Sequence, residues 1–140
     1  HYTNPDMARG TADEDAARKE YCMMEDVDVE QVGFITNNCA HHIVGASPDG
    51  LVGKSGMVEI KCHRNYVLLQ RHKGNGEMHM AQLQGNLWIA EREWIDLFCY
   101  SKNMKPWKQR VRRDENYIAR LKVGVEAFAD ELLLMAEKYR

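Results

Sequence analysis

Apolar positions recur along the chain with two periods, and the change between them marks the predicted helices and strands. Small and apolar residues at helical spacing occupy 6–24 and 79–92, and a shorter helix is predicted over 64–72. Runs rich in β-branched and aromatic residues predict strands. These strands cover 27–36, 42–46 continued by 51–52, 57–62, 94–100 and 107–112.

A last helix is predicted to begin after Asp114, which caps it, and to run to about Tyr139. Its apolar positions alternate in steps of three and four: Ile118, Leu121, Val125, Phe128, Leu132, Met135 and Tyr139. Such a seam packs either on the sheet of its own chain or on another subunit. We favour packing on the sheet, and Gly124 in mid-helix points to a close contact there.

The order of these elements predicts an α/β fold in which helices flank a mixed central β-sheet. The chain has 140 residues, 44% of them hydrophobic and 29% charged, as expected for one globular domain. No apolar stretch approaches the length of a membrane span. The chain begins with histidine, so we expect a single domain over 1–140 that lacks an N-terminal segment.

The segment from Ser47 to Lys61 carries the most specific chemical pattern. Glu59 and Lys61 stand two residues apart in an apolar strand, so their side chains emerge on one face of it, while Val58 and Ile60 point to the other. Charged groups on a buried strand are costly unless they have a use. A hairpin would bring Asp49 alongside, and two carboxylates form a site that suits Mg²⁺.

Three blocks in this order resemble a known nuclease family. They are Gly45-Ala46-Ser47-Pro48-Asp49-Gly50-Leu51-Val52, Val58-Glu59-Ile60-Lys61-Cys62 and Met80-Ala81-Gln82-Leu83-Gln84. The first two contain the PD-(D/E)xK signature, as Pro48-Asp49 and Glu59-Ile60-Lys61. Together the blocks resemble the lambda-type phage exonucleases, the YqaJ-like viral recombinase family, over about Arg9 to Arg120. The resemblance implies the PD-(D/E)xK, or restriction-endonuclease-like, core.

The resemblance also implies the metal ligands. Asp49, Glu59 and the backbone carbonyl of Ile60 match the positions that hold the metal in this family. Glu14 matches a helix glutamate that helps to hold a second ion, and its alternative is an exposed acidic helix face. The implied cofactor is Mg²⁺, with Mn²⁺ as a substitute.

Two further residues complete the expected catalytic set. Lys61 would orient the attacking water and stabilise charge on the phosphate, and a simple salt bridge to Glu59 is its alternative. Gln82 matches a family glutamine that contacts the scissile phosphate or its water, a task that suits a neutral amide.

The charge is distributed unevenly along the chain, although the formal net charge is only −2. Residues 1–30 carry nine acids, whereas 101–113 carry six basic residues and no acid. Within this basic segment Lys108, Arg110 and Arg112 alternate along one strand face, either to follow a DNA backbone or as a solvated sheet edge. We also predict DNA contacts for Arg9, Ser47 and His79.

The remaining candidate ligands and aromatic residues predict structure more than chemistry. Cys22, Cys39, Cys62 and Cys99 are too far apart for a zinc knuckle, so we expect free buried thiols in a reducing cytoplasm. His41 and His42 would point to opposite faces of a strand, which argues against a shared metal. The three tryptophans, Trp88, Trp94 and Trp107, are assigned to the core.

The function expected from these observations is a metal-dependent 5′→3′ exonuclease on linear duplex DNA. It would leave 3′ single-stranded tails for phage recombination, inside a bacterial host. Direction, a ring-shaped homotrimer and a single-strand annealing partner rest on the resemblance alone. A PD-(D/E)xK endonuclease and an inactive DNA-binding module remain the alternatives.

Overall fold

The two central strands of the sheet are nearly continuous apolar runs, and their residues are buried on both faces. The structure, a computed structural model, describes the backbone of residues 4–140 and the side chains of residues 4, 5 and 12–140. β5 (Gly56–Cys62) and β6 (Trp94–Tyr100) pair in parallel, with Glu59 opposite Leu97. Burial on both faces is typical of parallel strands that are covered by helices.

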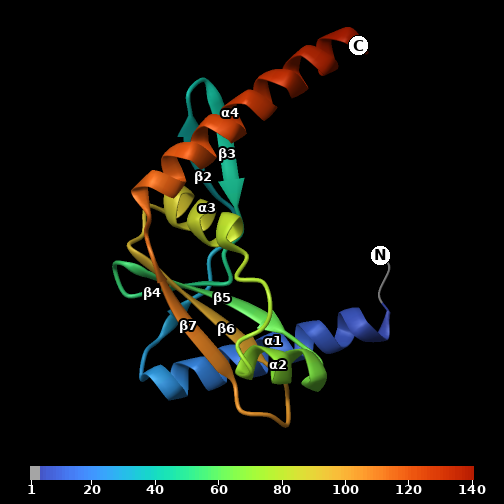
Figure 1. Ribbon diagram of the computed structural model, residues 1–140, viewed down its shortest axis with the longest axis vertical. Helices are drawn as coiled ribbons and strands as arrows, with labels where there is room; N and C mark the ends of the chain where they lie inside the picture. Colours follow the sequence, from blue (N-terminus) through green and yellow to red (C-terminus); the bar gives the residue numbers. More distant parts are fainter. Residues whose placement is uncertain (1–3) are drawn as a thin grey trace.

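The other strands extend this pair into a mixed five-stranded sheet with the order β1-β4-β5-β6-β7 (Figure 1). β1 (Val29–Glu30), β4 (Gly50–Val52) and β7 (Trp107–Arg112) join it by antiparallel pairing. β2 (Ile35–Cys39) and β3 (His42–Ala46) form a separate two-stranded sheet.

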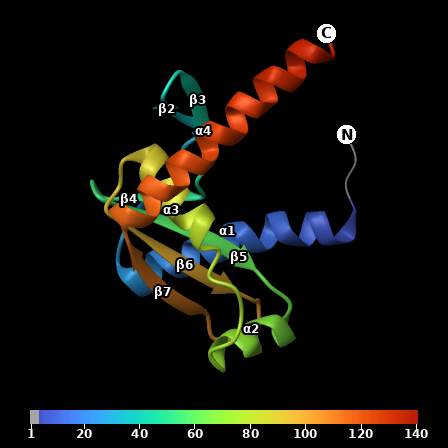
Figure 2. The same ribbon diagram turned by 45° about the horizontal axis from the view of Figure 1, so that its top comes forward.

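Helices cover both faces of the large sheet, as Figures 1 and 2 show. α1 (Pro5–Glu25) packs Ala17 and Tyr21 on one face. α2 (Asn65–His72) and α3 (Met80–Ala90) lie on the other, where their leucines meet β5 and β6. The predicted α/β fold with a mixed central sheet is therefore confirmed. Within the described residues, none of the helices is both long and apolar enough to cross a membrane.

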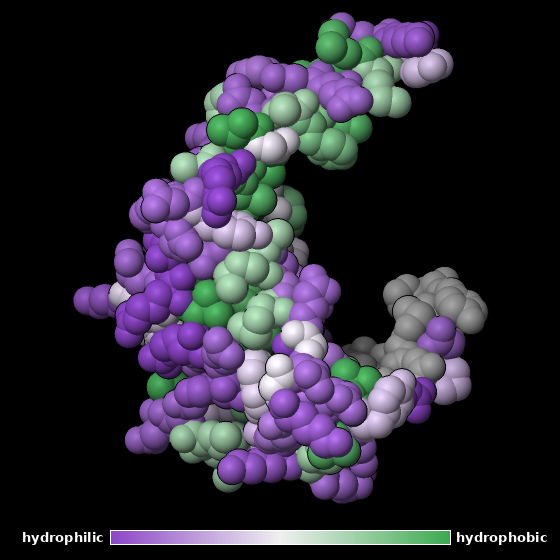
Figure 3. Space-filling model, viewed as in Figure 1, coloured by the Kyte–Doolittle hydropathy of each residue, from purple (hydrophilic) through white to green (hydrophobic). Residues whose placement is uncertain are grey.

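α4 (Glu115–Lys138) packs along only part of its length. Ile118 is buried and Leu121 and Val125 are partly buried, in a cluster with residues of α3, β2 and β3. Beyond this point the helix projects from the body of the molecule (Figure 1), and apolar side chains line its surface (Figure 3). Phe128, Leu132, Met135 and Tyr139 of the predicted seam are exposed. The prediction of packing on the sheet was wrong for this outer half, because the sheet ends short of it.

Gly124 also differs from its prediction. A methyl group added at this residue would meet no atom within 4 Å, so no neighbour lies close against the helix there.

The largest difference from the predicted elements lies between residues 27 and 52. The strand predicted over 27–36 is two strands, β1 and β2, which belong to different sheets. The strand predicted over 42–46 and 51–52 is likewise divided into β3 and β4. The alternation of residues does not change at either break. The two strands on each side differ in the distant segments with which they pair. β6 and β7 were predicted with the bounds that the structure has.

The cysteines and the paired histidines bring one confirmation and one correction. All four cysteines are free thiols, as predicted, although only Cys39 and Cys99 are fully buried. The expectation that His41 and His42 point to opposite faces was wrong, since their rings lie 4.0 Å apart and both approach Asp130. His41 belongs to the turn between β2 and β3, where strand alternation does not apply.

The N-terminus of α4 carries the predicted cap, and this yields a first test. The Asp114 carboxylate accepts a hydrogen bond from the backbone N–H of Tyr117 at 3.0 Å. Replacing Asp114 with alanine leaves that N–H without its partner and should lower the free energy of unfolding by about 1 kcal/mol. Urea unfolding followed by circular dichroism measures this loss. An unchanged midpoint would show that α4 adds nothing to the cooperative unit.

Candidate active site

Asp49 lies at the mouth of the β4–β5 hairpin, at the point where strand pairing stops. The last pair of this ladder joins Gly50 with Val58. Beyond this pair the Asp49 side chain contacts β5, where its Oδ2 accepts a hydrogen bond from the backbone N–H of Ile60 at 2.8 Å. In a strand the N–H and C=O of one residue point to the same side. The carbonyl of Ile60 therefore points toward the side of the strand on which Asp49 lies.

Glu59 is the most unusual ionisable group of the site. Its side chain is buried, with 4% of the residue exposed. Burial, the neighbouring charge of Asp49 and a hydrogen bond with that carboxyl group raise the pKa of Glu59 to about 8, against a partial opposing effect of Lys61. The fold thus holds two carboxyl groups together in a place that disfavours their charges.

Lys61 and Gln82 complete the group from two different elements. Lys61 follows Glu59 on the same face of β5, and α3 carries Gln82 over that face. The Gln82 amide connects the two, since its Nε2 donates to Glu59 at 2.8 Å and its Oε1 accepts from Lys61 Nζ at 2.9 Å. Lys61 Nζ itself lies 3.5 Å from Glu59 Oε2. The structure therefore brings together the four residues predicted to be catalytic.

The donor set fits a hard divalent cation. Two carboxylates and a backbone carbonyl are oxygen ligands of the kind that Mg²⁺ and Mn²⁺ accept. Burial and the neighbouring Asp49 raise the pKa of Glu59, and a cation between Asp49 and Glu59 would favour the charged form of both groups. Asp49, Glu59 and the Ile60 carbonyl are the groups that would hold it.

Comparison with known proteins agrees with this geometry. The family model of the YqaJ-like viral recombinase domain matches residues 1–93. The chain belongs to this family. Curated protein sequences gave no match.

Solved structures similar to this YqaJ-like domain include two named exonucleases. The alkaline exonuclease LHK-Exo from Laribacter hongkongensis is 31% identical, with a TM-score of 0.87 over 99% of this chain and 74% of its own. Its complex with dAMP gives a TM-score of 0.89 at the same identity and coverage. A phage-related exonuclease from Haemophilus somnus 129PT shares the fold at 11% identity, with a TM-score of 0.69 over 97% of this chain and 75% of its own. The family and these matches support a phage-type exonuclease.

Glu14 reaches the site through an arginine that the sequence analysis did not single out. Arg18 Nη2 donates to Glu14 at 2.9 Å and lies 3.4 Å from the backbone carbonyl of Asp49. Arg18 thereby ties α1 of the YqaJ-like domain to the turn that carries Asp49. Its position one helical turn after Glu14 was the available signal.

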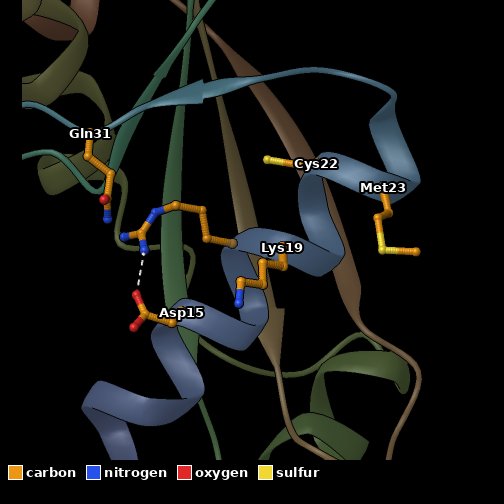
Figure 4. Close-up of a pocket in the computed structure, with 6 residues that line it drawn as sticks. Asp15, Lys19, Cys22, Met23 and Gln31 are labelled. Atoms are coloured by element: carbon orange, nitrogen blue, oxygen red, sulfur yellow. Dashed lines mark hydrogen bonds and ion pairs between the residues drawn. The ribbon is translucent and has the colours of Figure 1, made fainter.

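Behind this contact lies an open pocket of about 640 Å³, shown in Figure 4. Asp15, Lys19, Cys22, Met23 and Gln31 line it together with Arg18. The Arg18 guanidinium also donates a hydrogen bond to the Asp15 carboxylate, at 3.2 Å. Neither Asp49 nor Glu59 lines this pocket, so we assign it no part in the chemistry.

His63 is a second residue that the sequence analysis missed. It continues the alternation that places Glu59 and Lys61 on one face, and burial together with the charge of Arg71 lowers its pKa. Its Nε2 is buried and has no hydrogen-bond partner among the residues that the structure describes. Of the predicted DNA contacts, His79 lies near His63 at the start of α3, and Ser47 is exposed beside the Asp49 turn. Arg9 lies outside the described side chains.

The basic row of β7 lies on the opposite face of the sheet, beneath α1. Asp96, which is fully buried, pairs with Arg110 at 2.8 Å, and Lys108 pairs with Glu25. Two of the three cations predicted to follow DNA are thus paired with carboxylates of the chain itself, although Arg110, like Arg112, is exposed. Their contact with DNA stays a prediction, and their partners give them a structural role as well. Arg110 also stacks 3.6 Å above the ring of Trp94.

Proposed function

We propose that this YqaJ-like domain is a Mg²⁺-dependent exonuclease that degrades linear duplex DNA in the 5′→3′ direction. The buried Glu59 beside Asp49, with Lys61 and Gln82 in hydrogen-bond contact, is the observation that carries the proposal. The product would be duplex DNA with 3′ single-stranded tails for phage-type recombination. Mn²⁺ would substitute for Mg²⁺, since both accept carboxylate oxygens.

A bound divalent ion would polarise the scissile phosphate and lower the pKa of an attacking water. Asp49 and Glu59 fix the place of such an ion with the Ile60 carbonyl. The hydrogen bond from Ile60 N–H holds Asp49 in this orientation. Glu14 is our proposed ligand for a second ion, and Arg18 would position it beside the Asp49 turn.

Lys61 and Gln82 would act on the phosphate. The Lys61 ammonium offers donors where negative charge develops in the transition state, so we assign it electrostatic stabilisation. Gln82 orients the Lys61 and Glu59 side chains through its hydrogen bonds to both. Its amide can also donate to a phosphate oxygen or to the attacking water. Both side chains are accessible enough to meet a substrate, with Lys61 half-buried and Gln82 exposed.

Four aspects of the biology are proposed with it. Double-stranded DNA ends are the proposed substrate, supported by LHK-Exo in its complex with dAMP, because a nucleoside monophosphate is the unit that an exonuclease releases. A homotrimer is supported by the apolar residues that α4 leaves exposed. We also propose a single-strand annealing partner and a place in the bacterial cytoplasm, for which membership of a viral recombinase family is the support.

The decisive experiment compares linear with covalently closed circular duplex DNA, each with and without Mg²⁺. We expect degradation of the linear DNA alone, only when Mg²⁺ is present. Lys61→Ala should slow this degradation by roughly 10²–10³-fold, because it removes a charge that stabilises the transition state. Gel electrophoresis of timed samples measures both rates.

Lys54→Ala is the matched control, since Lys54 is an exposed lysine in the turn that precedes β5. It should degrade DNA at the wild-type rate. Cutting of the circular DNA would make the protein an endonuclease on the same fold. Binding of DNA without degradation of either form would make it an inactive DNA-binding module.

A further inference from the structure

The β2–β3 turn and α4 bring together three side chains that the nuclease chemistry does not use. His42 Nε2 lies 2.7 Å from Asp130 Oδ1, and His41 Nε2 lies 3.3 Å from the same oxygen. One ligand atom from each of the three side chains falls within 4.8 Å of the other two. Among the described residues, no other three histidine, cysteine or acidic side chains gather this closely.

These three ligand atoms lie close enough together to surround a single transition-metal ion after a small adjustment. With zinc–nitrogen and zinc–oxygen bonds of about 2.0–2.2 Å, ligand atoms at the corners of a tetrahedron stand roughly 3.3–3.5 Å apart. The distance of 3.3 Å from His41 already has this value, and the distance of 2.7 Å from His42 is that of a hydrogen bond. A small outward movement of the Asp130 carboxylate would open room for the ion.

We propose that His41, His42 and Asp130 form a Zn²⁺ site separate from the nuclease centre. Two imidazoles and one carboxylate suit Zn²⁺, and three protein ligands leave a fourth position for water. On binding, Zn²⁺ would take the His42 Nε2 lone pair, so the neutral ring would carry its single proton on Nδ1, and the Asp130 carboxylate would exchange the His42 hydrogen bond for the ion. The all-oxygen pair of Asp49 and Glu59, by contrast, suits Mg²⁺.

The position of the site gives it a structural consequence. Asp130 lies in α4 beyond Val125, which packs in the cluster with α3, β2 and β3, and before the exposed Leu132 and Met135. His41 and His42 belong to the β2–β3 hairpin, which contacts α4 earlier through Cys39 and the Lys122 carbonyl. A Zn²⁺ ion at Asp130 would therefore join the hairpin to α4 at the base of its projecting half (Figure 1). It would fix the direction in which the exposed apolar side chains of α4 point.

Titration calorimetry with ZnCl₂ on the metal-free chain tests the site. We expect saturable binding of one ion per chain, and loss of that binding in His41→Ala and in Asp130→Asn. His41 is 65% exposed at its side chain, so its replacement leaves the fold intact, and circular dichroism verifies this. Glu131→Gln, which changes the exposed acid next to Asp130, is the matched control and should bind Zn²⁺ as the wild type does.

A second variant separates this site from the nuclease centre. Glu59→Gln should keep the Zn²⁺ binding, whereas His41→Ala should keep Mg²⁺-dependent DNA degradation. Absence of saturable binding in the wild type, or its loss in Glu59→Gln with retention in His41→Ala, would overturn the proposal.

Hydrogen–deuterium exchange tests the structural consequence. Zn²⁺ should slow amide exchange in α4 after Asp130 in the wild type and leave it unchanged in His41→Ala. Zn²⁺ binding without any slowing in the wild type would refute the proposed joining of hairpin and helix.

Discussion

Replacing Glu59 with glutamine is expected to abolish DNA degradation and, at the same time, to stabilise the metal-free protein at pH 8. The loss of activity follows from the removal of a proposed metal ligand. The gain in stability follows from the removal of a carboxyl group that the fold holds, buried, beside Asp49. An active-site residue is expected to lower the stability of the fold where function requires two groups of like charge to lie close together.

The sign follows from the pKa of Glu59 in the two states. Its pKa is about 8 in the folded protein and 4.5 in its ordinary, unfolded environment. Below pH 4.5 the group is protonated in both states and has no differential effect. Between the two values only the unfolded chain loses the proton, so stability falls as the pH rises, and above about 8 the loss is complete. At pH 8 its size is on the order of a few kcal/mol.

Thermal unfolding at pH 5 and pH 8, with a chelator present, measures this effect. The wild type should lose more stability between these pH values than Glu59→Gln, and the variant should be the more stable of the two at pH 8. With Mg²⁺ present, the wild type should be the more stable of the two at pH 8. The ion binds the carboxylate pair of the wild type, whereas the variant lacks one of the two carboxylate ligands. Glu137→Gln, an exposed substitution near the end of α4, serves as control. A lower midpoint for Glu59→Gln at pH 8 without metal would contradict the expectation.

Replacing Asp96 with alanine is expected to have the opposite effect on stability and to be among the most damaging substitutions in the sheet. Asp96 is fully buried in β6 and accepts hydrogen bonds from Arg110 at 2.8 and 3.0 Å and from the Tyr21 hydroxyl at 2.6 Å. Hydrogen bonding to Asp96 raises the pKa of Arg110, and burial together with this hydrogen bond raises that of Tyr21. The carboxylate thus joins α1 and β7 to the central strand.

The expected loss is about 3 kcal/mol, the lower end of the range for a broken buried ion pair, because the partly exposed Arg110 can turn to water. For a chain of this length the melting temperature should fall by about 10 °C. Tyr21→Phe removes one hydrogen bond and keeps the ion pair, so its loss should be smaller, about 1.5 kcal/mol.

Urea unfolding of the two variants and of Asp28→Asn, an exposed control, measures these differences. Equal losses for Asp96→Ala and Tyr21→Phe would mean that the ion pair with Arg110 contributes nothing. The row of cations on β7 would then be free for the DNA contact that its sequence pattern predicts.

That the residues of the candidate site lie together could be predicted from strand alternation and from a recognisable motif, whereas their chemistry stays a prediction. Glu59 and Lys61 share a face of β5 by strand alternation, and their spacing from Pro48-Asp49 matched a recognisable motif. The hydrogen bond from Ile60 to Asp49 and the link of Gln82 to Glu59 and Lys61 agree with that motif. The raised pKa of Glu59 could not be predicted in this way, because it depends on the burial that the other elements provide.

The pairing of segments that lie far apart in the chain could not be predicted from local pattern. A run of apolar residues is equally suited to β1 and to β2, so the pattern over 27–36 could not show that these strands enter different sheets. The alternation of Lys108 and Arg110 was read correctly as one strand face. That the face lies against α1, with Glu25 and Asp96 as partners, depends on residues at least fourteen positions away.

The sequence by itself determined the type and order of most elements, the face of each central strand, and the carboxylates, lysine and glutamine of the site. The elements and the faces of the strands arise between residues two to four positions apart, where backbone geometry sets the period. The site residues came from the resemblance of three sequence blocks to a nuclease family. Only the tertiary structure decided which strands pair, where α4 leaves the core, and that His41 and His42 meet Asp130. Such contacts join distant segments, and their positions follow from the packing of the whole chain around its core.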